Sequence, residues 1–312
     1  MYDVLSVGIM VADVIVKPVD AFPRRGALEV VDSVEVFSGG NAMTASINIT
    51  KLGLKSALLS KVGNDAFGDF LVNHLEKCGV TSKGIKRTDE VNTSASVVIS
   101  NSDGERSILH YKGSNNSFCL NDIDFDIVKD SNVVFVTGSF LMSAFDGKDT
   151  VEFLKECKRL GKTTALDVCW DATADPKWLL HDAMPYIDLF MPSIDEAKMI
   201  AGKDDIEEIA DAFFENGAGS VIIKCGGDGC YVRKDKDSKG VMIPPFFVQN
   251  VVDTTGAGDS FCSGFLSAYA KGMDIYECAK FGNATGACCV MKKGATNGTL
   301  TFEETLKFME NF

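Results

Sequence analysis

The most informative part of the sequence for fold and chemistry is the stretch Val251-Val252-Asp253-Thr254-Thr255-Gly256-Ala257-Gly258-Asp259-Ser260-Phe261. Downstream of it, apolar residues recur at the spacing of one helix face, namely Phe261, Phe265, Leu266 and Tyr269. This spacing predicts that the glycines lie where a loop passes into a helix N-terminus. Free backbone N–H groups and the positive end of the helix dipole meet at such a corner, so we expect it to bind an anion.

Asp259 follows these glycines directly and suggests a catalytic role. In-line phosphoryl transfer to an alcohol needs a carboxylate beside an anion-binding corner. The carboxylate accepts the hydroxyl proton, while the N–H groups of Gly256, Ala257 and Gly258 neutralise charge on the phosphate. The alternative is an acid that only favours the helix dipole. No Walker A sequence, third dinucleotide glycine or G-x-S-x-G elbow accompanies the stretch, so Gly256-x-Gly258 alone is a weak signal.

Short apolar runs alternate with helical patterns over most of the chain. The runs are Val4 to Ile9, Ala57 to Leu59, Val133 to Thr137, Thr164 to Val168, Leu189 to Met191 and Val221 to Lys224. Alternating strands and helices predict a parallel sheet with helices on both faces. The expected fold class is therefore α/β, a Rossmann-like three-layer α/β/α arrangement with a mostly parallel central sheet.

Two stretches lack helices between their strands. Residues 13–37, including Leu28-Glu29-Val30-Val31, and residues 94–111 are interpreted as strands, with a hairpin turn at Asn101-Ser102-Asp103-Gly104. We expect these stretches to form a small antiparallel β lid. The main α/β domain then comprises residues 1–12, 38–93 and 112–312.

Composition narrows the classes of partner. The 312 residues are 46% hydrophobic and 24% charged, as in a globular protein, and the formal net charge of -13 disfavours nucleic acid. An acidic N-terminus and the lack of apolar runs near roughly 18 residues predict no export signal and no membrane partner. Ten scattered cysteines favour buried thiols and a cytoplasmic location. His74, His110 and His181 show no metal-ligand spacing.

Asp253 to Asp259 match D-T-x-G-A-G-D, and the chain therefore resembles the ribokinase-like (PfkB) carbohydrate kinase family. Further ordered matches are Gly8 with Asp13, Phe37 to Ala45, Met191 to Glu196, Ile223 to Gly229, Asn283-Ala284 and Lys293-Gly294-Ala295. Three positions depart from the family pattern. Thr44 stands where many members have Asn, and Ser193 replaces the Asn of N-x-x-E. After Gly294, this chain has Asn297-Gly298 where the family often has a hydroxyl residue in the cation loop. The resemblance covers most of the chain and implies a ribokinase-like fold.

The resemblance also implies roles for individual residues. Those that would bind the substrate are Asp13, Gly39, Gly40, Asn41 and Thr44. Arg106 is a further candidate for a substrate or phosphate contact, from its position on the predicted lid strand rather than from the resemblance. Those that would bind the nucleotide are Lys224, Gly226, Gly229 and Asn283. Those that would lie near Mg²⁺ or a monovalent cation such as K⁺ are Glu196, Asp253, Thr255 and Gly294. Ordinary turn, edge-strand and helix-terminus positions remain the alternative for Asp13, Arg106 and Glu196.

Together these observations predict an ATP-dependent kinase that phosphorylates a sugar hydroxyl with Mg²⁺, and with K⁺ as a further cation. A second hypothesis keeps the fold and makes a nucleoside the acceptor, with Phe37, Phe140 or Tyr111 forming a slot for its base. A third is a catalytically silent module that binds sugar or nucleotide. A homodimer through the lid is also expected.

Overall fold

The computed structural model describes residues 1–103, 105–169 and 175–312. Gly104, the last residue of the predicted hairpin turn, lies outside these ranges. The helices are α1 Asn41–Lys51, α2 Ala66–Lys77, α3 Phe125–Lys129, α4 Lys148–Arg159, α5 Ile194–Ala201, α6 Ile206–Glu215, α7 Ala257–Ala270, α8 Ile275–Val290 and α9 Phe302–Glu310. Short helical turns cover Gly113–Ser117, Leu120–Asp122, Leu179–Ala183, Met184–Tyr186 and Gly226–Asp228.

Nine strands form the large sheet in the order β13-β12-β11-β10-β9-β8-β1-β4-β5. They are β1 Tyr2–Gly8, β4 Ser56–Gly63, β5 Ile85–Thr88, β8 Ser131–Ser139, β9 Thr163–Val168, β10 Leu189–Phe190, β11 Ser220–Lys224, β12 Cys230–Arg233 and β13 Val241–Ile243. Pairing is parallel from β5 to β11 and antiparallel from β11 to β13. The predicted mostly parallel α/β fold is confirmed.

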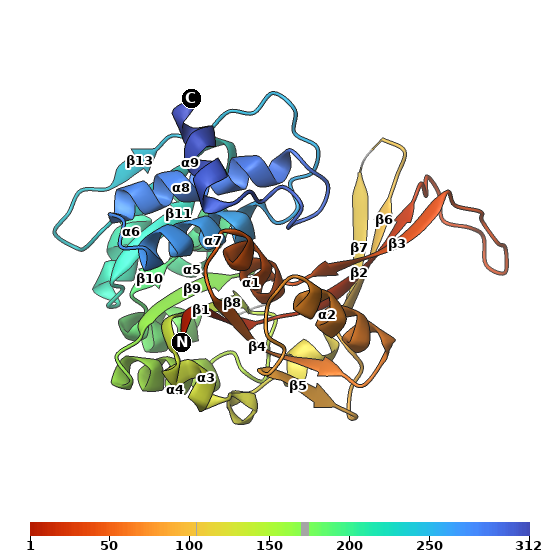
Figure 1. Cartoon of the computed structure of the whole chain (residues 1–312), viewed down its shortest axis with the longest axis horizontal. Coiled ribbons are helices and arrows are strands. Elements are labelled where there is room, and N and C mark those ends of the chain that lie inside the picture. The colour runs from red at the N-terminus through yellow and green to blue at the C-terminus, as the bar shows by residue number, and fades with distance from the viewer. Residues whose placement is uncertain (104, 170–174) are drawn as a thin grey trace.

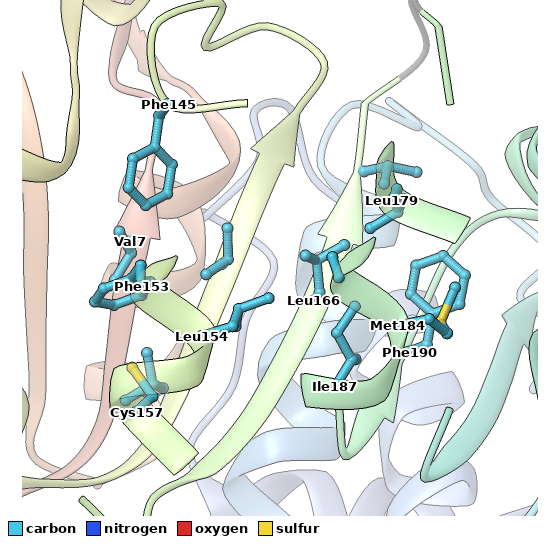
Figure 2. Close-up of a cluster of buried hydrophobic side chains, with 14 of the residues drawn as sticks. Val7, Phe145, Phe153, Leu154, Cys157, Leu166, Leu179, Met184, Ile187 and Phe190 are labelled. Carbon is cyan, nitrogen blue, oxygen red and sulfur yellow. The ribbon is translucent and has the colours of Figure 1, made fainter. Parts of the chain in front are cut away.

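Helices cover both faces of this sheet, because its strands are apolar on both sides. On one face, side chains of α4 pack toward β1, β8 and β9, and those of α5 and α6 toward β10 and β11, in one cluster. Figure 2 shows part of this cluster, with Phe153 of α4 beside Val7 of β1 and Leu154 of α4 directed toward Leu166 of β9. On the other face, α1, α7 and α8 pack in a second cluster around Phe261 and Phe265. The sheet is thus the middle of three layers (Figure 1).

Four strands form the small sheet, which projects from one side of the body (Figure 1). They are β2 Val11–Lys17, β3 Ser33–Gly39, β6 Ala95–Ser100 and β7 Arg106–Tyr111, in the order β3-β2-β6-β7. The outer pairs are antiparallel, including the predicted β6-β7 hairpin. The central β2-β6 pair is parallel, so the sheet is mixed rather than wholly antiparallel as expected.

One predicted strand is wrong. Residues 28–31 are not in a strand, and Leu28 and Val30 are more than four-fifths exposed. The β-branched pattern suggested a strand, but among the residues that the structure describes this segment has no strand to pair with and Leu28 and Val30 no surface to pack on. It belongs instead to the long connection between β2 and β3.

The small sheet leaves the large one just after β1. Gly8 ends β1 opposite Thr137 of β8, and the chain then turns into β2. Strand order reverses around β1, with β4 on one side and β8 on the other. In open parallel sheets, ligands bind outside the carboxyl ends of the strands at such a reversal. Within the described ranges, no helix combines the length and apolar composition needed to cross a membrane.

Candidate active site

The first turn of α7 has the predicted loop-to-helix geometry. Gly256 precedes the helix with φ 77° and ψ 7°, in the left-handed region that favours glycine. A Cβ at this position would lie 2.3 Å from the Cβ of Ala295. The turn therefore needs glycine. The N–H of Ala257, the first helical residue, donates to the Thr254 carbonyl at 3.2 Å, while the amides that follow it in the first turn have no carbonyl within the helix to bond to.

Asp259 lies in this first turn and faces a cavity. Its Oδ1 accepts a hydrogen bond from Asn41 Nδ2 at 2.8 Å, which ties α7 to the first residue of α1. The residue keeps some surface on the cavity, while protein surrounds it elsewhere. Burial raises the pKa of Asp259 above its ordinary value; the hydrogen bond from Asn41 and the Lys224 ammonium oppose this rise, and Glu196 adds to it.

The cavity that Asp259 faces lies between the small sheet and the body, and we call it the small-sheet cavity. Its volume of about 340 Å³ is in the range of small-molecule sites. The predicted site residues that line it are Asp13, Gly39, Gly40, Thr44, Arg106, Asp253, Thr255, Gly256, Asp259 and Gly294. The fold therefore places residues that are distant in the sequence around the small-sheet cavity.

Asp13 supplies a second carboxylate to this cavity. It lies on β2, opposite Phe37 of β3. Burial raises the pKa of Asp13 to about 6, although a hydrogen bond with Ser96 acts to lower it. Gly39 permits this placement, because a Cβ there would lie 2.0 Å from Asp13 Oδ2. The carboxylate is therefore held against a bare stretch of backbone.

Arg106 joins the small sheet to the loop before α7. Its guanidinium donates to Thr255 Oγ1 at 3.0 Å and pairs with Asp253 Oδ1 at 3.3 Å. Asp253 also accepts from the backbone N–H of Thr255 at 3.0 Å and of Gly294 at 2.9 Å. Although burial acts to raise it, these backbone bonds hold the pKa of Asp253 below its ordinary value.

Lys293 makes a second bridge that the sequence interpretation did not assign to a role. Its Nζ lies 2.7 Å from Glu35 Oε2 on β3 and 4.8 Å from the centre of the Phe37 ring. Lys293 also lines the small-sheet cavity. The small sheet is therefore attached to the body on two sides of the cavity, through Arg106 and Lys293.

A second cavity, the glycine-loop cavity, lies on the other side of the first turn of α7. Its volume is about 370 Å³. The predicted site residues that line it are Lys224, Gly226, Gly229, Ala257, Gly258 and Asn283. Its other walls are largely apolar, including Phe246 and Phe247. The Asn283 amide donates to the carbonyls of Ile243 and Pro244, at 3.1 and 3.0 Å, and so fixes the edge of this wall.

Lys224 has a buried partner that the sequence interpretation missed. Its Nζ lies 2.6 Å from Asp167 Oδ1, and these side chains are 12% and 2% exposed. Burial alone would lower the pKa of Lys224, but the Asp167 carboxylate outweighs burial and the pKa lies above its ordinary value. The available signal was position, since Asp167 and Lys224 lie at or next to the last residue of apolar strands, at the carboxyl edge of a parallel sheet.

Glu196 lies outside both cavities. It is 8% exposed and completes a capping box at the start of α5, where its Oε2 accepts from the Ser193 N–H at 2.7 Å. In the described ranges, no three His, Cys, Asp or Glu side chains are arranged to hold a metal ion. A Mg²⁺ ion here would therefore need phosphate oxygens in addition to a carboxylate, as is usual for this ion.

The three aromatic residues considered for a base-binding slot separate in the structure. Phe37 lines the small-sheet cavity, together with Phe70. Tyr111 is half exposed and lines a different depression. Phe140 is 5% exposed and packs edge-on against Trp178. Only Phe37 of the three is therefore placed to contact a ligand in this cavity.

The two cavities lie on either side of the first turn of α7, which suggests that a ligand in each cavity could react with the other at this turn. A polar ligand between Asp13 and Asp259 would meet an anion placed against the amides of Gly256 to Gly258. Lys224 supplies a cation on the glycine-loop side. The arrangement is chemically suited to moving an anionic group from one ligand to the other.

Comparison with known proteins gives a consistent result. A family model described as pfkB family carbohydrate kinase matches residues 1–301. The chain is 29% identical over 293 residues to the 2-dehydro-3-deoxygluconokinase of Bacillus subtilis. The matched region covers 91% of this chain and 90% of that protein. The structure of Arabidopsis thaliana ribokinase complexed with ribose and ATP superposes with a TM-score of 0.86 at 25% identity, covering 99% of both chains. Ribokinase from Thermotoga maritima gives 0.85 at 25% identity over the whole of both chains.

Proposed function

The chain belongs to the pfkB family of carbohydrate kinases, and on that premise we propose that it transfers the γ-phosphoryl group of ATP to a hydroxyl of a sugar, with Asp259 as general base. The acceptor oxygen attacks the γ-phosphorus, and the bond to the bridging oxygen of ADP breaks. Asp259 takes the hydroxyl proton as the new bond forms.

One observation carries this proposal: Asp259, Asp13 and Gly39 line the same cavity. A sugar there can present one hydroxyl to Asp259 while its other hydroxyls bond to Asp13 and to the backbone at Gly39, Gly40 and Asn41. Thr44, only 2% exposed, offers a hydroxyl at the floor of the cavity. An Asp259 side chain directed into the core would have excluded a role as base.

We assign the glycine-loop cavity to ATP. Its apolar walls suit an adenine ring, and Gly226, where an added Cβ would meet no atom within 4 Å, leaves the backbone open to the ribose and phosphates. The γ-phosphate would then reach the amides of Gly256, Ala257 and Gly258. The relative of known structure with ribose and ATP supports this choice of ligands.

Cations are also part of the proposal. Mg²⁺ would neutralise charge on the phosphates, with Glu196 as the carboxylate predicted for it, although that group already caps α5. We retain K⁺ near Asp253, Thr255 and Gly294 as part of the proposal. The Asp253 carboxylate already accepts three hydrogen bonds there, so backbone carbonyls would supply most of the ligands.

A panel of acceptors tests the proposed function. Purified protein with ATP and Mg²⁺ is assayed for ADP release against neutral sugars, sugar acids, sugar phosphates and nucleosides, in K⁺ and in Na⁺. Sugar-dependent ADP release, with the phosphorylated product identified by mass spectrometry, is the expected result. Measurable ATP binding without acceptor-dependent ADP release from any compound would favour the catalytically silent module instead.

A nucleoside acceptor is the second candidate, and one observation favours it. Ile15, Val98 and Ile108 form a row across the inner face of the small sheet, and all three line the small-sheet cavity. This apolar row, with Phe37 beside it, offers a surface for a base. In the same panel, a nucleoside with a kcat/KM well above that of every sugar would establish this alternative.

We further propose that the small sheet acts as a lid and that two copies pair through it. Closure over the sugar would exclude water and limit wasteful hydrolysis of ATP. The sheet and the connection from β2 to β3 leave apolar side chains exposed, namely Phe22, Leu28, Val30, Val34, Leu109 and Tyr111. Burying them against a second copy is the expected use of such a surface. Light scattering of wild type and Leu109→Asp tests this, with a monomeric wild type contradicting it.

The proposed location remains the cytoplasm. All ten cysteines are free thiols, which agrees with a reducing compartment. Fluorescence microscopy of a tagged chain would test the location.

A further inference from the structure

We propose that Asp167 is a positioning residue: it fixes the Lys224 ammonium beside Gly258, on the phosphate side of the α7 turn, and so keeps this cation from pairing with Asp259. The inference rests on the proposed function, because it assigns Asp167 a role in phosphoryl transfer. Asp167 itself would contact neither the sugar nor ATP.

The positions of the strands make this contact possible. Asp167 is the penultimate residue of β9, and Lys224 is the last residue of β11. The strand between them, β10, is only two residues long and ends at Phe190. Beyond that end the Lys224 side chain reaches Asp167, with 2.6 Å between Nζ and Oδ1. The Val168 N–H donates to the same Asp167 oxygen at 2.9 Å, which fixes the carboxylate.

The ammonium of Lys224 lies next to the proposed anion-binding turn. A Cβ added to Gly258 would lie 3.8 Å from both Cε and Nζ of Lys224. Lys224 and Gly258 also line the glycine-loop cavity together. The cation is therefore within reach of a phosphate held by the α7 amides, whereas Asp167 is buried behind it.

Other groups around Lys224 compete for its charge. Asp259 and Glu196 both interact electrostatically with it or with its partner, and Cys262 Sγ lies 3.7 Å from Nζ. No ion pair joins Lys224 to Asp259 in the described ranges. Without Asp167, the ammonium would turn toward the nearest remaining carboxylates. Pairing with Asp259 would remove the base from use and take the cation away from the phosphate.

A purely structural role for the pair predicts something different. Buried ion pairs add little net stability, and replacing both partners by apolar groups of similar size is often neutral or stabilising. Removing one partner is costly, because it leaves a buried charge uncompensated. A structural pair would therefore affect unfolding but leave the turnover of the folded protein unchanged, and kinetics can separate the two roles.

The test compares Asp167→Asn, Lys224→Met and the double variant with wild type. Loss of one electrostatic group at the transferring phosphate costs about 10²- to 10³-fold in kcat, which we expect for Lys224→Met. Asp167→Asn should lower kcat by about 10- to 100-fold with little change in the KM for the sugar, and it should lower Tm. The double variant should have the kcat of Lys224→Met and a Tm above that of Asp167→Asn, because the ammonium that Asp167→Asn leaves unpaired is removed as well.

Either of two results would overturn the proposal. One is an unchanged kcat in folded Asp167→Asn. The other is a double variant that is slower than Lys224→Met by the full factor of Asp167→Asn, which would show that Asp167 acts independently of Lys224. The kcat values of the double variant and of Lys224→Met can still be compared if Asp167→Asn alone fails to fold.

Binding measurements separate this proposal from the proposed function. If wild type phosphorylates no acceptor, the proposed function fails, and the role of Asp167 is judged from Kd values for ATP and ADP by titration calorimetry. The preference for ATP over ADP should be lost in Lys224→Met and reduced at least threefold in Asp167→Asn. An unchanged ratio of the two Kd values in Asp167→Asn would contradict the positioning role.

Discussion

Replacing Asp259 by Asn removes the proposed base with almost no change in shape. The new amide oxygen can still accept the hydrogen bond that Asn41 donates at 2.8 Å. The amides of Gly256 to Gly258 and the Lys224 ammonium remain in place, so binding of the phosphate should persist. A positioned general base contributes about 10²- to 10⁴-fold. At about 1.4 kcal/mol per power of ten, this corresponds to roughly 3–5 kcal/mol of transition-state stabilisation.

The same substitution should stabilise the fold. Burial raises the pKa of Asp259, so the folded protein disfavours the ionised form relative to the unfolded chain. For an acid with a raised pKa, ionisation at neutral pH lowers the free energy of unfolding. A neutral amide removes that cost. We therefore expect Asp259→Asn to lower kcat and to raise Tm at pH 7.5.

The assay couples ADP release to NADH oxidation at saturating sugar and ATP, and Tm is followed by circular dichroism. The matched control is Asp205→Asn, the same change at the start of α6, which lies outside both cavities. The control should keep the wild-type kcat. A kcat within threefold of wild type for Asp259→Asn would refute the role of Asp259 as base, and a lower Tm would refute the reasoning on its buried charge.

Three further predictions concern the pocket and the core. Burial raises the pKa of Asp13 to about 6 from its ordinary value of 3.8, so acceptor binding measured by titration calorimetry should weaken as the pH falls below 6. The free energy of unfolding of Asp13→Asn should exceed that of wild type by up to about 3 kcal/mol at pH 8, and this gain should vanish near pH 4. Equal gains at both pH values would contradict the prediction. Arg106→Met should raise the KM for the sugar several-fold but change the free energy of unfolding by less than about 1 kcal/mol, because the pair with Asp253 is partly exposed; an unchanged KM would remove Arg106 from the pocket. Phe265 is a fully buried side chain of α7, so Phe265→Ala should lower the free energy of unfolding, measured with urea, by about 3–5 kcal/mol. A loss below 1 kcal/mol would show that the stability of the fold does not depend on the packing of this helix.

The central strands of the large sheet, β1, β4 and β8 to β11, could be predicted because their signal is local, whereas the edge strands β5, β12 and β13 were not predicted. Each run from Val4 to Ile9 and onward to Val221 to Lys224 is a continuous apolar strand, and a strand buried on both faces needs no long-range information to be recognised. The small sheet was predicted less completely. Its parallel β2-β6 pair joins residues more than eighty positions apart, and no local pattern specifies that pairing.

Residues 28–31 show the opposite failure. Their β-branched and apolar side chains satisfy a strand pattern, but propensity becomes structure only where a neighbour supplies hydrogen bonds and a surface. Leu28 and Val30 have neither within one chain. A second copy paired through the small sheet, as proposed above, would supply such a surface.

The residues of the candidate site could be predicted where they belong to a sequence motif, but not where only the order of the strands brings them together. Asp259 and Gly256 belong to one short string, and Asp13 and Gly39 belong to two more. Asp167 has no motif around it in the sequence. It acquires a partner only because β9 and β11 lie two places apart in the sheet and the strand between them is short. Such contacts follow from strand order, which periodicity does not reveal.

The most direct test of the account is a crystal structure with a sugar acceptor, Mg²⁺ and a non-hydrolysable ATP analogue. We expect the acceptor oxygen at about 3 Å from an Asp259 carboxylate oxygen, other sugar hydroxyls bonded to Asp13, and the terminal phosphate against the amides of Gly256 to Gly258. A sugar bound outside the small-sheet cavity, or with no hydroxyl directed at Asp259, would contradict it.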